Sequence, residues 1–235
     1  MKRVADSRDR RLTLWLATLL ALSVTACRAP PAPRPQAAAP AGPAGATQFK
    51  IDADASKIWL YLHPDGALTR LGHSHVITTR ALQGSVWGSP QLERSSCELQ
   101  LAVSGFVVDD PQERAAAGGE FSEPLDATAR AGTREHMLGD RQLHVARFPL
   151  VLLHCRRFAS VAGGATVELA VTLRDHETEL TVPVNWQRAG DALQASGEFT
   201  FRQSDLGMEP YSLLFGALRV ADDIRARFVL VAHQT

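Results

Sequence analysis

The sequence predicts a mainly β domain, either a closed antiparallel barrel or a sandwich of about eight strands, with one helix in a long connection. The first observation is the alternation of apolar and polar residues over residues 167–173 and 179–186, which is typical of strands with one buried and one wetter face. The second is the turn chemistry between apolar runs, at residues 64–66, 163–164 and 190–191.

The predicted strands are rich in β-branched and aromatic residues. In chain order they are residues 57–63, 82–87, 97–108, 147–158, 167–173, 179–186, 193–201 and 224–232. In the strand predicted at 147–158, every residue from 148 to 153 is apolar, whichever face of the strand it would point to. We therefore expect both faces of this strand to be buried, with the inward face lining a lumen and the outward face under the helix. A strand between two layers, with no ligand, would give the same pattern.

The predicted helix covers residues 126–139, between the strand at 97–108 and the strand at 147–158. Asp126 or Thr128 is suited to cap its first turn, and Gly139 is suited to end it. This segment breaks the alternation and therefore forms the long connection.

The first 27 residues have the pattern of an export signal. Residues 1–26 combine a basic start, an apolar core at residues 12–22 and small residues before Cys27, which is the layout of a secretory signal. The core is shorter than the ~20 residues of a transmembrane helix. Its end, VTAC, resembles a bacterial lipobox and predicts lipidation of Cys27; an ordinary cleaved signal is the alternative. Residues 27–48 are a Pro/Ala-rich tether, and residues 49–235 form one domain.

Charge and cysteine content narrow the function classes. The 25 basic and 25 acidic residues balance, so nothing indicates a nucleic-acid partner. With Cys27 lipidated, Cys97 and Cys155 remain as an even pair in an exported chain, which favours a disulfide. Both cysteines lie at the same end of the sheet if their two strands pair antiparallel. Two buried free thiols are the alternative.

Five short motifs follow one another along the domain. They are FKID with ASKI at residues 49–58, REHML with RFP at 134–149, TLR with LTVPV at 172–184, GEFTFRQSDLG at 197–207 and the last strand at 224–232. Their order resembles the YceI-like, polyisoprenoid-binding family of bacterial periplasmic proteins over nearly all of residues 49–232. Residues 71–76 and 115–124 depart from the family pattern, and we interpret the second stretch as an inserted loop.

The resemblance implies a lipocalin-like antiparallel β-barrel that holds a long-chain isoprenoid or quinone-like lipid, with no catalytic constellation and no other cofactor. The ligand would contact apolar wall positions, which here are Leu99, Leu101, Phe148, Leu150, Leu152, Leu169, Val171, Val182, Val184, Phe199 and Phe201. The expected location is the periplasmic side of the bacterial cell envelope, as an outer-membrane lipoprotein. Lipid and membrane are the expected partners, and homodimerisation stays open.

Two other function classes stay open. His73 and His75 are two apart, so on a strand they would point the same way and could share a metal ion in a metal- or redox-linked envelope enzyme. Imidazoles bonded to backbone groups at the barrel mouth are the alternative. The sequence has no Gly-x-Ser-x-Gly elbow and no dinucleotide or phosphate loop, which disfavours an enzyme. The third class is an envelope scaffold without a lumen ligand.

Overall fold

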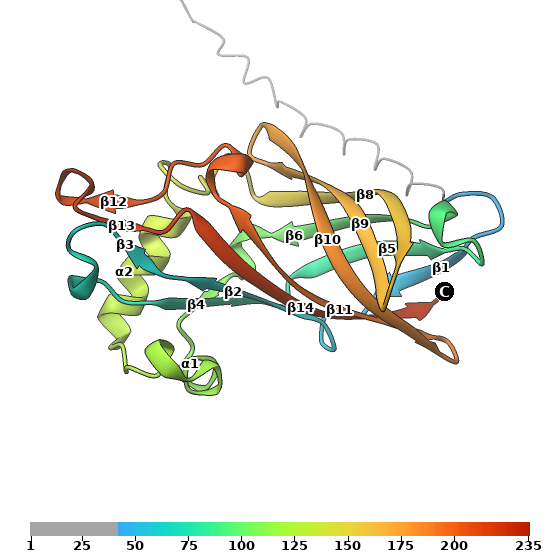
Figure 1. Ribbon diagram of the computed structural model, residues 1–235, viewed down its shortest axis with the longest axis horizontal. Coiled ribbons are helices and arrows are strands. Elements are labelled where there is room, and N and C mark those ends of the chain that lie inside the picture. The colour runs from blue at the N-terminus through green and yellow to red at the C-terminus, as the bar shows by residue number, and fades with distance from the viewer. Residues whose placement is uncertain (1–41) are drawn as a thin grey trace, which may run out of the picture. The chain divides into compact units, whose positions relative to one another are not determined.

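The computed structural model describes residues 42–235 (Figure 1). The predicted signal peptide at residues 1–26, the lipidation candidate Cys27 and the tether up to residue 41 lie outside the described residues. The strands are β1 Thr47–Ile51, β2 Lys57–Leu62, β3 Pro64–Asp65, β4 His75–Thr79, β5 Leu82–Gly88, β6 Ser96–Ala102, β7 Val107–Val108, β8 Leu150–Val161, β9 Gly164–Leu173, β10 His176–Ala189, β11 Ala192–Arg202, β12 Ser212–Leu213, β13 Leu218–Val220 and β14 Asp223–Gln234. The α-helices are α1 Pro111–Ala117 and α2 Ala127–Leu138.

Eight strands close one antiparallel barrel, in the order β1-β5-β6-β8-β9-β10-β11-β14, with β14 pairing back onto β1. The turns at residues 161–164 and 189–192 lie at the same end of this barrel, which we call the hairpin end. The prediction of a mainly β, lipocalin-like barrel of about eight strands is thus confirmed, and the sandwich alternative is wrong.

At the opposite end, β2, β4 and β7 extend the sheet from β14. The predicted strand at 97–108 is therefore interrupted: the 3₁₀ turn Val103–Gly105 separates β6, which pairs with β8, from β7, which pairs with β4. A Cβ on Gly105 would lie only 2.3 Å from the Cβ of Ala81, so this close crossing requires glycine.

Both α-helices and the small sheet β12-β13-β3 lie at this second end, which we call the helical end (Figure 1). The predicted helix is confirmed as α2, which begins where the Asp126 side chain accepts the Ala129 N–H at 2.8 Å and ends at Gly139. The sequence prediction omits α1, although Asp110 caps it and Pro111 opens it. None of the helices within residues 42–235 has the length and apolarity to cross a bilayer.

The remaining predicted strands all occur, most of them longer than predicted. The sequence prediction omits β1 and β4 as strands. In β4, four of the five residues, Val76 to Thr79, are buried on both faces of the strand. Its sequence therefore does not alternate between apolar and polar residues, and no strand is predicted there.

Candidate functional site

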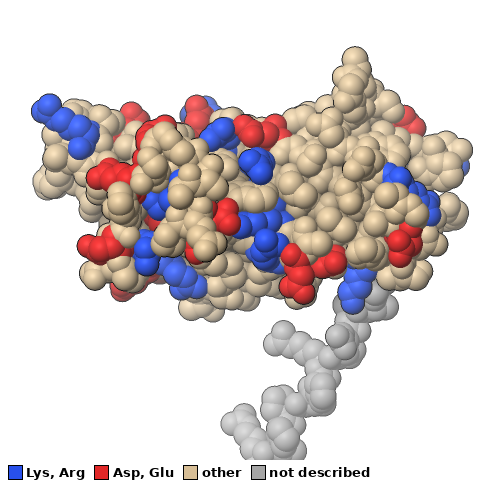
Figure 2. All heavy atoms as spheres, turned by 90° about the horizontal axis from the view of Figure 1, so that it is seen from below, with Lys and Arg blue, Asp and Glu red and all other residues tan. Residues whose placement is uncertain are grey.

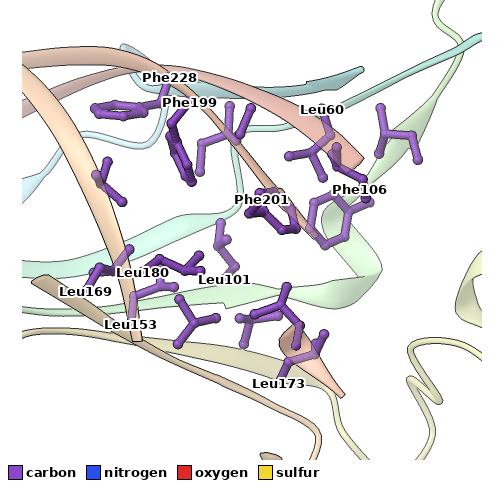
Figure 3. A pocket seen from close by; sticks show the side chains of 18 of the residues that line it. Leu60, Leu101, Phe106, Leu153, Leu169, Leu173, Leu180, Phe199, Phe201 and Phe228 are labelled. Carbon is purple, nitrogen blue, oxygen red and sulfur yellow. The ribbon is translucent and has the colours of Figure 1, made fainter. Parts of the chain in front are cut away.

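An apolar cavity of about 640 Å³ fills the barrel interior. Its lining comes from all eight barrel strands and from α2, and most of it is Leu, Val, Ile and Phe. Figure 3 shows side chains from several parts of the barrel around the same space: Leu101 of β6, Phe106 just before β7, Phe199 and Phe201 of β11, and Phe228 of β14. The volume lies within the ~300–1,000 Å³ of small-molecule sites, and an apolar lining of this kind suits an apolar ligand.

Most of the predicted wall positions line this cavity. They are Leu99 and Leu101 on β6, Leu169 and Val171 on β9, Val182 and Val184 on β10, and Phe199 and Phe201 on β11. Period-two alternation places them inward, because alternate residues of a barrel strand face the lumen. That they contact a ligand stays a prediction.

Three predicted positions, Phe148, Leu150 and Leu152, lie outside the cavity. Phe148 precedes β8 and packs beside Arg147, whose guanidinium lies 4.9 Å from the centre of the ring. Leu150 and Leu152 point away from the lumen, and Leu152 is 47% exposed, so the expectation that both faces of this strand are buried is wrong. Because every residue of this run is apolar, the sequence does not indicate which side chains face the lumen. In the structure Val151 and Leu153 take the inward positions.

Cys97 on β6 and Cys155 on β8 are directly opposite residues of two paired strands, and their sulfur atoms form a disulfide. Their Cα atoms lie 4.9 Å apart, and both residues are buried in the wall of the cavity. The alternative of two free thiols is therefore wrong for this structure.

The cavity becomes polar at the helical end, where four histidines line it and three of them, His63, His73 and His75, each lie beside an acidic residue. Nδ1 of His63 lies 3.2 Å from Glu120 Oε2, and Nδ1 of His73 lies 3.5 Å from Glu123 Oε2. Nδ1 of His75 lies 2.6 Å from Asp109 Oδ2. All three acidic residues come from residues 109–123, which run from the end of β7 through α1.

Asp109 is the centre of a buried polar network, and its side chain is 0% exposed. Its Oδ1 accepts the Val76 N–H at 2.9 Å and Arg114 Nη1 at 2.7 Å, and its Oδ2 accepts His75. Arg114, 3% exposed, also donates to the Ser74 and Glu123 carbonyls. Within residues 42–235, every buried side-chain nitrogen or oxygen has a partner. Such a network fixes residues 74–76 against residues 109–123.

The surroundings lower the pKa of two of these carboxyl groups, Asp109 and Glu120. Burial alone would raise the pKa of Asp109, but hydrogen bonds from His75, Val76 and Arg114 and the charge of His75 hold it below its ordinary value. A hydrogen bond from Ser74, with a smaller one from His63, lowers the pKa of Glu120 against its slight desolvation. The histidines at the mouth of the cavity are thus held from behind by carboxylates.

A family model of the YceI-like domain matches residues 49–232. The chain belongs to the YceI-like domain family. The matched range is the one over which the five motifs resemble this family, so the sequence prediction of the family is confirmed.

Solved structures agree with this YceI-like fold. BcnA of Burkholderia cenocepacia is similar over 77% of this chain and 98% of its own, with 15% identity and a TM-score of 0.58. The YceI protein of Campylobacter jejuni is similar over 68% of this chain and 84% of its own, with 8% identity and a TM-score of 0.50. At such identities the likeness shows the fold alone. Comparison with curated proteins gives no match.

In this YceI-like domain, His73 and His75 bond to different acidic residues rather than converging on one point. His73 precedes β4, whereas His75 begins it, so the expected strand geometry covers only one of the two. Within residues 42–235, no three His, Cys, Asp or Glu side chains are grouped as a metal site. His136 of α2 stacks instead on Tyr211, with ring centres 4.9 Å apart.

Sequence reasoning missed the acidic partners of these histidines. Glu120 and Glu123 lie in the stretch interpreted as an inserted loop, and Asp109 lies at the end of a predicted strand. A signal was present in Asp110-Pro111, because a capping aspartate followed by proline predicts a helix start and therefore an ordered segment here.

Proposed function

We propose that this YceI-like domain binds a long apolar lipid, of the isoprenoid or quinone-like class, in the lumen of its barrel. The observation that supports this function is the apolar cavity of about 640 Å³, lined from every barrel strand. Burial of a hydrocarbon chain contributes ~0.8 kcal/mol for each methylene and requires shape more than polar chemistry. The histidine side chains that line the cavity at the helical end, His63, His73 and His75, would face the polar head of such a lipid.

The proposed setting is the periplasmic side of a bacterial envelope. Support comes from the sequence: a lipoprotein-type signal at residues 1–26, Cys27 as lipidation site, and a proline-rich tether that leads to the domain. A domain tethered near a membrane meets its lipid at a high effective concentration. The residue after Cys27 is Arg28 rather than aspartate, which fits sorting to the outer membrane.

Two adjacent leucines of β8 provide a matched test of lumen binding. Leu153 lines the cavity, whereas Leu152 points outward and is exposed. In Leu153→Gln a polar amide enters the apolar wall, so the affinity for a pyrene-labelled fatty acid, measured by fluorescence titration in vesicle-free solution, falls about ten-fold or more. Leu152→Gln keeps the wild-type affinity.

Leu153→Met serves as the second control, because it keeps an apolar wall and should restore binding. Urea unfolding of each variant separates loss of binding from loss of folding. The proposal fails if wild-type protein binds no probe, or if both glutamine variants bind it equally. Native mass spectrometry of protein purified from an envelope fraction then identifies the lipid by its mass.

A further inference from the structure

The turn between β12 and β13 carries unusually exposed apolar side chains. Phe215 is 112% exposed, more than in an extended reference chain, and Leu214 is 60% exposed. Leu71 and Leu213 are also exposed, and we call these four residues the apolar tip. Single exposed apolar residues are ordinary, but a group of them marks an interaction site.

The backbone presents this tip in a fixed way. Leu214 and Phe215 have φ angles of 51° and 57°, a left-handed conformation that residues with a Cβ rarely adopt. The Ala217 N–H closes the turn on the Leu214 carbonyl at 3.2 Å, and the Leu68 N–H donates to the Ala217 carbonyl at 2.9 Å. The turn is therefore bonded to the loop that carries Leu71, and its side chains project outward from a supported frame.

The apolar tip borders the mouth of the cavity at the helical end. Leu71 and Leu213 belong to the tip and also line the cavity, as does Leu218 on β13. Figure 1 shows the β12–β13 turn projecting beyond the barrel strands at this end, and Figure 2 shows basic side chains at the same end. Two exposed basic residues, Arg70 and Arg219, flank the tip in sequence, and Arg219 also pairs with Asp65, with its Nη2 2.6 Å from Asp65 Oδ2.

We propose that the apolar tip inserts into the surface of a lipid bilayer and sets the helical-end mouth against it, so that the lipid passes between bilayer and lumen without crossing water. This inference rests on the proposed lipid-binding function. Aromatic and aliphatic side chains flanked by arginine suit the interfacial region, where rings lie at headgroup level and cations meet anionic headgroups. A bilayer fits better than a protein partner because the apolar surface continues from the tip into the lumen.

Tryptophan reporters in the full chain test the docking directly. Phe215→Trp places one at the tip, and Val161→Trp places another at an exposed apolar position of the hairpin end. With vesicles of phosphatidylethanolamine and phosphatidylglycerol that contain brominated lipid, quenching above the wild-type tryptophan background is strong at position 215 and weak at position 161. Equal quenching at both positions would overturn the proposal.

Transfer kinetics test the consequence. Leu214→Ser/Phe215→Ser extracts a pyrene-labelled fatty acid from the same vesicles about ten-fold more slowly than wild type, whereas Leu152→Ser/Val161→Ser keeps the wild-type rate. Both variants keep the probe affinity in vesicle-free solution. If the probe does not bind there, the proposed function fails, and quenching at position 215 alone decides the docking. The proposal would also be overturned if the protein dimerises without vesicles, the tip variant abolishes the dimer, and position 215 is not quenched. The tip would then bind a second copy of the chain.

Discussion

Two regions of the molecule are stabilised in different ways. One is the wall formed by β9, β10 and β11, and the other is the helical end around residues 63–76 and 109–123. In the wall, neighbours along the chain are neighbours in the sheet, as in the pair Leu180 and Leu169. Its inward side chains are apolar and line the cavity. At the helical end, residues distant in sequence meet through charges, and Asp109 joins Val76, His75 and Arg114.

The difference separates two kinds of stabilisation. Apolar packing has no preferred direction, so a wall of Leu, Val and Phe can accept a ligand of variable shape and tolerate conservative changes of side chain. A buried carboxylate with three donors accepts only one arrangement, and loss of one partner leaves the others unsatisfied. The helical end is therefore suited to keep the mouth of the cavity in one geometry, whereas the wall can adjust to the shape of a ligand.

Asp109→Ala should produce the largest loss of stability. It leaves Arg114 buried without its carboxylate and the Val76 N–H without its acceptor. Removal of one partner of a buried ion pair costs about 3–5 kcal/mol, against a total of about 5–15 kcal/mol for a typical domain. Urea unfolding measures the change, and Asp109→Asn, which keeps an acceptor oxygen, serves if the alanine variant does not fold.

A wall carboxylate provides the matched control. Glu177 on β10 pairs with Arg156 on β8 in solvent, so Glu177→Ala should cost less than about 1 kcal/mol. Hydrogen exchange adds the location: Asp109→Ala should reduce the protection of β4 and α1 amides more than that of β9 and β10. Equal losses in the two variants would show that the buried network contributes no more than a surface pair.

Cys97→Ala/Cys155→Ala tests the barrel next to this wall, where the disulfide joins β6 to β8. The disulfide joins residues 58 apart in sequence, and a bond that closes a loop of this size contributes about 2–4 kcal/mol, mainly by constraining the unfolded chain. The loss, measured by urea unfolding without reductant, should spread over the whole domain, since the native contacts stay in place. A loss of protection confined to β6 and β8 would instead indicate that the disulfide holds a locally weak seam.

The same contrast explains what the sequence could predict. Alternation in β9, β10 and β11 identifies the strands and the inward residues, and Val171 and Phe199 follow directly from it. The prediction for Leu152 is wrong because its neighbours are apolar on both faces of the strand, so the sequence has no alternation to indicate the inward side. Only the register with β6 decides which way Leu152 points. The partnership of His75 with Asp109 spans 34 residues and depends on the pairing of β4 with β7, which no local pattern encodes. The acidic residues of the mouth were therefore beyond the reach of periodicity.

Lowering the pH should have the smallest effect of these tests, and it should act mainly on the helical end. The carboxyl groups with lowered pKa values are concentrated there. They are Asp65, Asp109, Glu113, Glu120 and Asp222. In Glu113, burial would raise the pKa, but hydrogen bonds from Lys57 and Trp59 lower it. Each of these carboxyl groups has its own hydrogen-bond donors, which stabilise its ionised form.

The sign of the pH dependence follows from linkage. A carboxyl whose pKa is lowered by folding binds fewer protons in the native state than in the unfolded chain, so its stabilising contribution is complete above the unfolded pKa of ~4 and is lost as the pH falls through the folded pKa. We therefore expect the free energy of unfolding, measured in urea at intervals between about pH 7 and pH 3, to fall toward the acid end. Asp109→Asn should flatten this fall. If this variant keeps the wild-type acid slope, the acid sensitivity belongs to other carboxyl groups, and Asp109 has no share in it.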